Sequence, residues 1–102
     1  MASPTRGPLS ALVRKQIEDQ MLLNRMSGRQ VARELEQMGF KMSQSTFSRI
    51  LRGEGDRDFT IDEVAATCEA IGLDFREVIR TADSLTSDRP RPARVIARRR
   101  GA

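Results

Sequence analysis

Four side chains within residues 43–52 have the chemistry to recognise base pairs: Gln44, Ser45, Ser48 and Arg49. A glutamine amide can bond adenine at two atoms and an arginine can do the same with guanine, each pair giving roughly 1–3 kcal/mol of discrimination. If the stretch is a helix, Arg49 lies one turn after Ser45, on the flank that begins with Gln44. We expect that flank to contact bases in a DNA major groove, with Ser48 touching a base or a phosphate. The alternative is the solvated face of a surface helix.

Basic and hydroxyl side chains around this stretch are candidates for contacts with DNA phosphates. They are Arg25, Ser27, Arg29, Arg33, Lys41, Ser43, Thr46 and Arg52. Residues 25–52 carry six basic and two acidic side chains, so positive charge gathers where phosphate attraction requires it. Each basic residue could equally serve only to keep a helix soluble.

The rest of the chain segregates charge strongly. Residues 53–88 carry ten acidic and three basic side chains, whereas residues 89–102 carry six arginines and no acid. We expect the acidic segment to face away from DNA, with Arg57 in a local ion pair. The terminal arginines are expected to lie along phosphates or to act only as a solubility tail: Arg94, Arg98, Arg99 and Arg100.

Composition excludes several classes of site. The chain has no histidine and one cysteine, so it cannot assemble a Ser-His-Asp or Cys-His nucleophile or a usual zinc site. We expect no enzyme activity, cofactor, metal or small-molecule ligand. No apolar run approaches the roughly 20 residues of a membrane span, and the lone cysteine fits a reducing cytoplasm, so we expect a cytoplasmic, nucleoid-associated protein. Cys68 is expected to be a core side chain.

Four places repeat the pattern that begins a helix, which predicts an all-helical domain. Ser27 with Gln30, Thr60 with Glu63 and Asp74 with Glu77 can each form a capping box. Ser43 supplies a fourth cap, with Thr46 in the third position. The predicted helices are Pro8–Asn24, Ser27–Met38, Ser43–Arg52, Thr60–Ile71 and Asp74 to about Thr81.

Helical periodicity predicts which side chains form the core. The expected core residues are Leu9, Leu12, Val13, Ile17, Met21, Val31, Ala32, Leu35, Met38, Phe47, Ile50, Ile61, Val64, Ala65, Cys68 and Ile71. We expect residues 1–8 to be flexible, residues 9–82 to form one compact domain, and residues 83–102 to be a disordered basic tail.

The run Met42–Ile50 continuing to Gly53, with Val31-Ala32 and Leu35 before it and Ala70-Ile71-Gly72-Leu73 after it, resembles the phage-repressor, Cro-like type of helix-turn-helix. The resemblance covers about residues 9–80 and implies a five-helix lambda-repressor-like domain. Two features depart from the family. Residues 36–41 lengthen the connection between the second and third helices, and Gly28 stands where many members have a phosphate-anchoring glutamine.

The resemblance implies a sequence-specific regulator of double-stranded DNA, most simply a repressor of phage or small bacterial type. Family members usually bind inverted half-sites as dimers, spaced by about 34 Å. Here the homodimer contact would come from exposed apolar residues such as Leu22, Leu23, Phe75 and Ile79. Two alternatives remain open: an antitoxin, or a protein-interaction adaptor that uses the acidic 53–88 surface.

Overall fold

The computed structural model describes residues 7–86, and this part of the chain is all-helical, with five helices and no strand. The helices are α1 (Pro8–Asn24), α2 (Gly28–Gln37), α3 (Gln44–Leu51), α4 (Ile61–Ile71) and α5 (Phe75–Leu85). The predicted all-α class and the positions of the five helices are confirmed. Residues 1–6 and 87–102, which include most of the predicted flexible N-terminus and the terminal arginines, lie outside the described residues. The predicted flexibility of residues 7 and 8 is wrong, because Gly7 is the N-cap of α1 and Pro8 is its first residue.

Local capping explains where the last four helices begin. Ser27, Ser43, Thr60 and Asp74 each occupy the N-cap, and each side chain accepts a hydrogen bond from a backbone N–H of the first turn. The predicted capping boxes form at Ser27 and at Thr60. At Asp74 only the cap itself forms, and the Glu77 carboxylate pairs with Arg80.

The core is formed by the inward faces of all five helices. Its largest fully buried side chains are Phe47, Ile17, Leu35, Ile71, Val31 and Val78. Burying a side chain of this size stabilises the fold by roughly 1.5–3 kcal/mol, so these faces hold the helices together.

The predicted burial of three residues is wrong, and a fourth, Ala65, is only partly buried. Leu9, Met38 and Ile61 are 37%, 37% and 68% exposed. Each lies at a helix terminus: Leu9 in the first turn of α1, Met38 at the C-cap of α2, and Ile61 at the first residue of α4. Periodicity identifies the face of a helix that points inward, but a neighbouring helix does not always cover that face to its end.

The end of α5 also differs from the prediction. Asp83 to Leu85 continue the helix, Ala82 is fully buried, and the Thr86 side chain is 5% exposed. The Thr86 hydroxyl donates to the Asp83 carbonyl at 3.0 Å and closes the last turn. The folded domain therefore extends to Thr86, and the predicted disorder of residues 83–86 is wrong.

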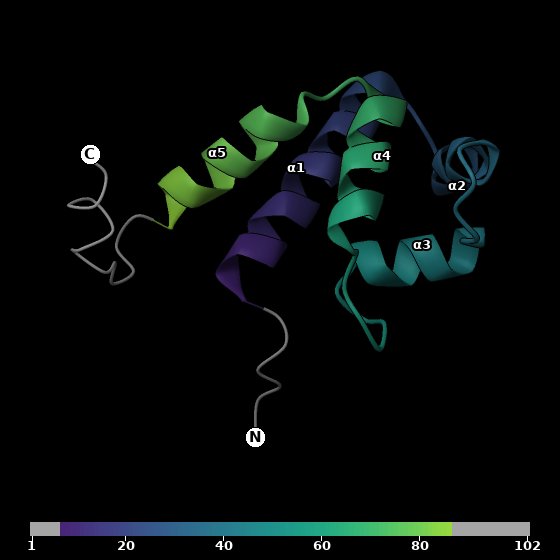
Figure 1. Cartoon of the computed structure of the whole chain (residues 1–102), viewed down its shortest axis with the longest axis horizontal. Helices are drawn as coiled ribbons and strands as arrows, with labels where there is room; N and C mark the ends of the chain where they lie inside the picture. The colour runs from purple at the N-terminus through teal and green to yellow at the C-terminus, as the bar shows by residue number, and fades with distance from the viewer. Residues whose placement is uncertain (1–6, 87–102) are drawn as a thin grey trace, which may run out of the picture.

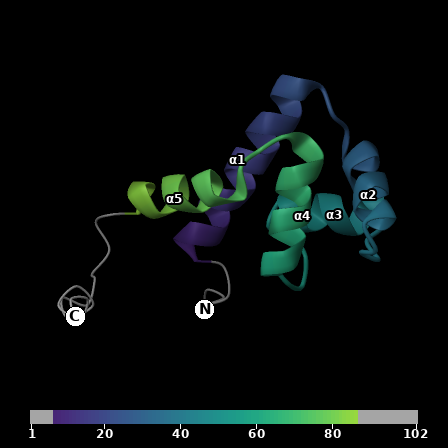
Figure 2. The same ribbon diagram turned by 45° about the horizontal axis from the view of Figure 1, so that its top comes forward.

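The helices are arranged around α1 and α4, which pack against each other in the middle (Figure 1). The helix α5 lies on one side of this pair, and α2 with α3 lies on the other, as a second view also shows (Figure 2). Polar bonds reinforce the centre: Gln16 donates to the Val78 carbonyl at 2.9 Å, and Asn24 donates to the Ile71 carbonyl at 2.9 Å. The α2–α3 unit thus projects from the side of the domain opposite α5.

Candidate nucleic-acid interface

The N-terminus of α2 is fixed by its capping box. The Gln30 N–H donates to Ser27 Oγ at 3.2 Å, and the Ser27 N–H donates to Gln30 Oε1 at 2.8 Å. Two of the backbone donors left unpaired at a helix start are satisfied in this way. The Ser27 hydroxyl, predicted to contact phosphate, therefore already has a structural role as an acceptor.

Gly28, the first residue of α2, lies directly against α3. A Cβ atom built on Gly28 would lie 3.0 Å from Ser48 Oγ, 3.8 Å from Phe47 Cδ2 and 3.9 Å from Gln44 Cγ. The absence of a side chain lets the two helices approach closely at this point. A side chain at this position would force Ser48 to shift by a few tenths of an ångström.

The helix α3 divides into a buried face and an exposed flank. Phe47 is fully buried and Ile50 is 2% exposed, whereas Gln44, Ser45 and Arg49 are exposed. Ser48 is only partly exposed because it faces Gly28. The predicted base-contacting residues thus share one flank, with Ser48 at its inner edge.

Phe47 anchors α3 to the loop that follows it. Its ring lies 5.5 Å from the ring of Phe59, with the two planes inclined at 44°. Tilted aromatic pairs of this kind contribute roughly 0.5–1.5 kcal/mol beyond area burial. The orientation of α3 therefore depends on this contact as well as on α2.

The connection between α2 and α3, residues 38–43, is long but packed. Gly39 ends the α2 turn with a φ of 98°, in the left-handed region that glycine adopts readily. Met42 is 7% exposed, and Phe40 packs partly against the core. Of the extra residues 36–41, residues 36 and 37 extend α2, and residues 38–41 lie in the connection, which these two side chains hold.

Among the residues predicted to contact DNA phosphates, Arg29 and Arg33 lie on α2 and Lys41 lies on the connection to α3. Arg29 and Arg33 border a shallow hollow of about 190 Å³ that also includes Ser43, Gln44 and one acidic residue, Glu36. Basic side chains of α2 therefore lie beside the start of α3, as a backbone clamp on DNA requires. Lys41 is exposed on the connection.

The remaining phosphate candidates have other local roles. The Ser43 hydroxyl caps α3 and bonds the Thr46 hydroxyl at 3.0 Å, while Arg52 pairs with Glu54 at 3.1 Å. Arg25, at the C-cap of α1, adopts a φ of 58° and is exposed. Ser43 lies in the same hollow as Arg29 and Arg33, whereas Arg25, Thr46 and Arg52 do not line it.

The acidic loop after α3 contains a feature that sequence reasoning missed. Arg57 donates to both carboxylate oxygens of Glu63 on α4, at 2.8 and 3.0 Å. The local ion pair predicted for Arg57 is thus confirmed, although its partner lies in the next helix. The only sequence signal at Glu63 was its position in the capping box, which does not reveal a second partner.

The electrostatics of Glu63 follow from its position. Burial would raise the pKa of this carboxyl, but hydrogen bonds from Arg57 and from the Thr60 backbone outweigh that effect and hold the pKa below its ordinary value. The Arg57 guanidinium is therefore held by Glu63 within the folded domain.

Asp56 and Arg57 share a polar hollow with Thr46 and Arg49, so the Asp56 carboxylate lies beside the flank of α3 that is predicted to contact bases.

Cys68 is a core residue, as predicted. Its side chain is 1% exposed, and burial, with a smaller contribution from the charge of Asp74, raises the pKa of the thiol to about 11.

The described residues hold no cluster of three or more histidine, cysteine, aspartate or glutamate side chains suited to a metal. Within residues 7–86, no helix combines the length and apolar character that crossing a bilayer requires.

Comparison with known proteins identifies no relative. No protein-family model matches the chain, and neither does any curated protein or solved structure. The geometry of α2 and α3 is therefore the basis on which function is inferred.

Proposed function

We propose that this chain is a double-stranded DNA-binding protein whose α3 enters the major groove. The exposed flank of α3 carries Gln44, Ser45 and Arg49, and α2 places Arg29 and Arg33 beside its start. This juxtaposition is the observation that carries the proposal. It matches the division between side chains that specify bases and side chains that position the protein on phosphates.

Within that class, we propose a sequence-specific transcriptional regulator, most simply a repressor of the phage Cro-like or immunity type, acting at the nucleoid. The order of helices and the sequence resemblance from residue 42 to residue 53 both favour it. Occupancy of an operator by α3 would block transcription without any catalytic chemistry.

Self-association would extend recognition to two half-sites. Leu22 and Leu23, near the end of α1, are 73% and 76% exposed and are the most exposed of the apolar residues expected to join two copies. Ile79 is 37% exposed, while Phe75 packs partly against the core. We therefore propose Leu22 and Leu23 as the main self-contact.

Two arginine substitutions distinguish a specific reader from a general polycation. Arg49→Ala is expected to weaken binding to the preferred sequence by about 1–3 kcal/mol while leaving other DNA nearly unaffected. Arg98→Ala is expected to weaken binding to all sequences and to reduce the log–log salt slope by about 0.9. Arg76→Ala, an exposed arginine on α5, is the matched control and should change neither. Equal losses from Arg49→Ala on every sequence would contradict specific reading.

A further inference from the structure

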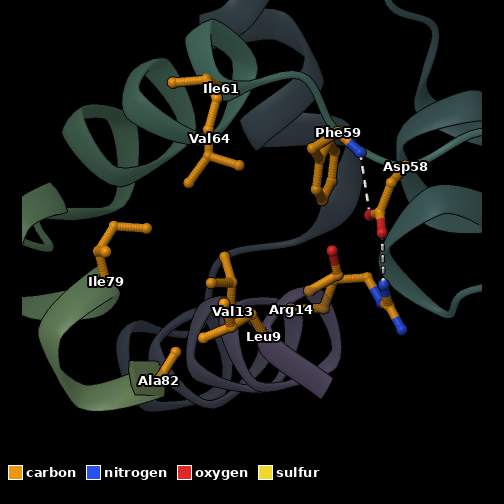
Figure 3. A pocket seen from close by; sticks show the side chains of 10 residues that line it. Leu9, Val13, Arg14, Asp58, Phe59, Ile61, Val64, Ile79 and Ala82 are labelled. Atoms are coloured by element: carbon orange, nitrogen blue, oxygen red, sulfur yellow. Dashed lines mark hydrogen bonds and ion pairs between the residues drawn. The ribbon is translucent and has the colours of Figure 1, made fainter. Parts of the chain in front are cut away.

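An apolar hollow of about 290 Å³ opens between α1, α4 and α5, on the side of the domain away from α2 (Figure 3). Its walls include Leu9 and Val13 from α1, Val64 from α4 and Ile79 from α5, which converge on an open centre. We call it the α1–α4–α5 hollow. The exposed apolar surface is substantial, because Ile61 at its rim is 68% exposed.

Few polar groups at this hollow can hold water. Its polar lining residues are Ser10, Arg14 and Asp58. The Asp58 carboxylate accepts one hydrogen bond from Arg14 at 3.0 Å and another from the Phe59 N–H at 3.0 Å, so it already has two donors within the fold (Figure 3). Water retained against apolar walls has few partners, and an apolar side chain that replaces it gains free energy. The hollow is therefore suited to apolar side chains.

The hollow continues toward the end of α5. Leu9 and Ile79 also line an adjoining shallow hollow that includes Phe75 and Asp83. Ala82 lines the main hollow, and Thr86, the last described residue, follows it by one helical turn, about 6 Å along the axis. The chain thus leaves the described domain beside this apolar surface and on the side opposite α3.

Residues 87–102 contain a segment that fits the hollow. Val95 and Ile96 are adjacent branched apolar residues, with Arg94 before them and Arg98 after. Val95 lies nine positions after Thr86, and nine extended residues span up to about 30 Å. This is more than enough to return from the end of α5 to the hollow.

Charge complementarity also favours residues 87–102 as the segment that occupies the hollow. Residues 53–86 carry nine acidic and three basic side chains, whereas residues 87–102 carry six arginines and one aspartate. Asp62, beside Ile61 on α4, is exposed and has no ion pair within residues 7–86. An arginine next to an anchored apolar pair would reach a carboxylate of this kind.

We propose that Val95 and Ile96 dock in the α1–α4–α5 hollow, with Arg94 directed toward the acidic α4–α5 surface. Tethering gives such a segment an effective concentration on the order of millimolar, so even a weak contact is populated. The proposal rests on the hollow and the adjoining sequence and does not depend on DNA binding.

Paramagnetic broadening in the full chain tests this contact. A nitroxide attached through Ala97→Cys reports on methyl groups near it, and Cys68 resists labelling because it is buried. The methyl signals of Leu9, Val64 and Ile79 are expected to lose most of their intensity, and those of Leu22 and Leu23, near the other end of α1, are expected to retain it. Replacing Val95 and Ile96 together by serine should restore the signals, whereas Ala93→Ser should not.

Three results would overturn the proposal. One is the absence of broadening at the hollow, which would leave it for another molecule. The second is broadening that the double serine substitution leaves unchanged, since the contact would then be made by charge alone. The third is broadening seen equally when spin-labelled, isotopically unenriched protein is mixed with enriched protein that carries no label, which would assign the hollow to a second copy.

Discussion

Replacing Glu63 by glutamine removes the charge of a side chain that joins the acidic loop to α4 while keeping its shape. The carboxylate accepts two hydrogen bonds from Arg57 and one, at 2.9 Å, from the Thr60 N–H. A glutamine retains one acceptor oxygen for Thr60 but turns an NH2 group toward Arg57. Hydrogen bonds to charged groups contribute about 1.5–3 kcal/mol. Because the Arg57 side chain is 47% exposed, solvent screening reduces the expected loss to about 1–2 kcal/mol.

The loss of stability caused by Glu63→Gln must change with pH in one direction. The pKa of Glu63 is lowered in the folded protein, so its stabilising contribution is fully present above the unfolded-state pKa of about 4.3. The contribution is lost as pH falls through the lower, folded-state pKa. The stability difference between the parent chain and Glu63→Gln should therefore be largest near neutral pH and shrink in acid.

Urea unfolding followed by circular dichroism measures both effects, from pH 7 down to the lowest pH at which the domain stays folded. Asp62→Asn is the matched control, since Asp62 lies in the same first turn, shares the interaction with the helix dipole and has no ion pair with any residue from 7 to 86. Equal losses for the two variants at pH 7 would refute the role of Arg57. So would a loss at Glu63 that stays constant as the pH falls.

Three further substitutions or reactions test the packing of the reading unit and core. Phe47→Ala should lower the free energy of unfolding by about 3–5 kcal/mol in urea titrations, and a loss below about 1 kcal/mol would contradict its place at the α2–α3 contact. Gly28→Ala should stabilise the fold by about 0.5–1 kcal/mol only in a chain that also carries Ser48→Ala, because that change removes the atom 3.0 Å from the new Cβ. A double-mutant cycle of the two substitutions measures this coupling, and strictly additive effects would contradict the close approach of Gly28 to Ser48. Cys68, with the pKa of its thiol raised to about 11, should react with a thiol reagent at pH 8 only after unfolding; full reaction in the folded protein would show that the thiol is accessible.

Much of the fold was predictable because helix starts are encoded locally. A hydroxyl or carboxylate cap three residues before an acid or amide needs no tertiary partner, and the starts at Ser27, Thr60 and Asp74 follow this rule. Ser43 caps α3 in the same local way, with Thr46 in the third position. The glycine stop after α4 is equally local: Gly72 adopts a φ of 83°. The exposed flank of α3 was predictable for a similar reason, since periodicity fixes which side chains share a face.

The features that the sequence did not reveal depend on contacts between elements. Leu9 and Ile61 continue apolar faces of their helices, yet they are exposed where the α1–α4–α5 hollow opens. The pairing of Arg57 with Glu63 requires the loop to fold back on α4. The fit of Gly28 against Ser48 requires the crossing of α2 and α3, which spacing along the chain does not determine.

Selection of bound sequences from a random double-stranded DNA pool, at about 150 mM salt, tests the proposed function most directly. At this ionic strength exposed charges are screened beyond about 8 Å, so general attraction between arginines and phosphates is weakened. We predict enrichment of a defined motif, most simply an inverted repeat, that Arg49→Ala abolishes. Binding without any enriched motif, lost when residues 87–102 are removed, would contradict a sequence-specific regulator and leave only a basic segment with general affinity for nucleic acid.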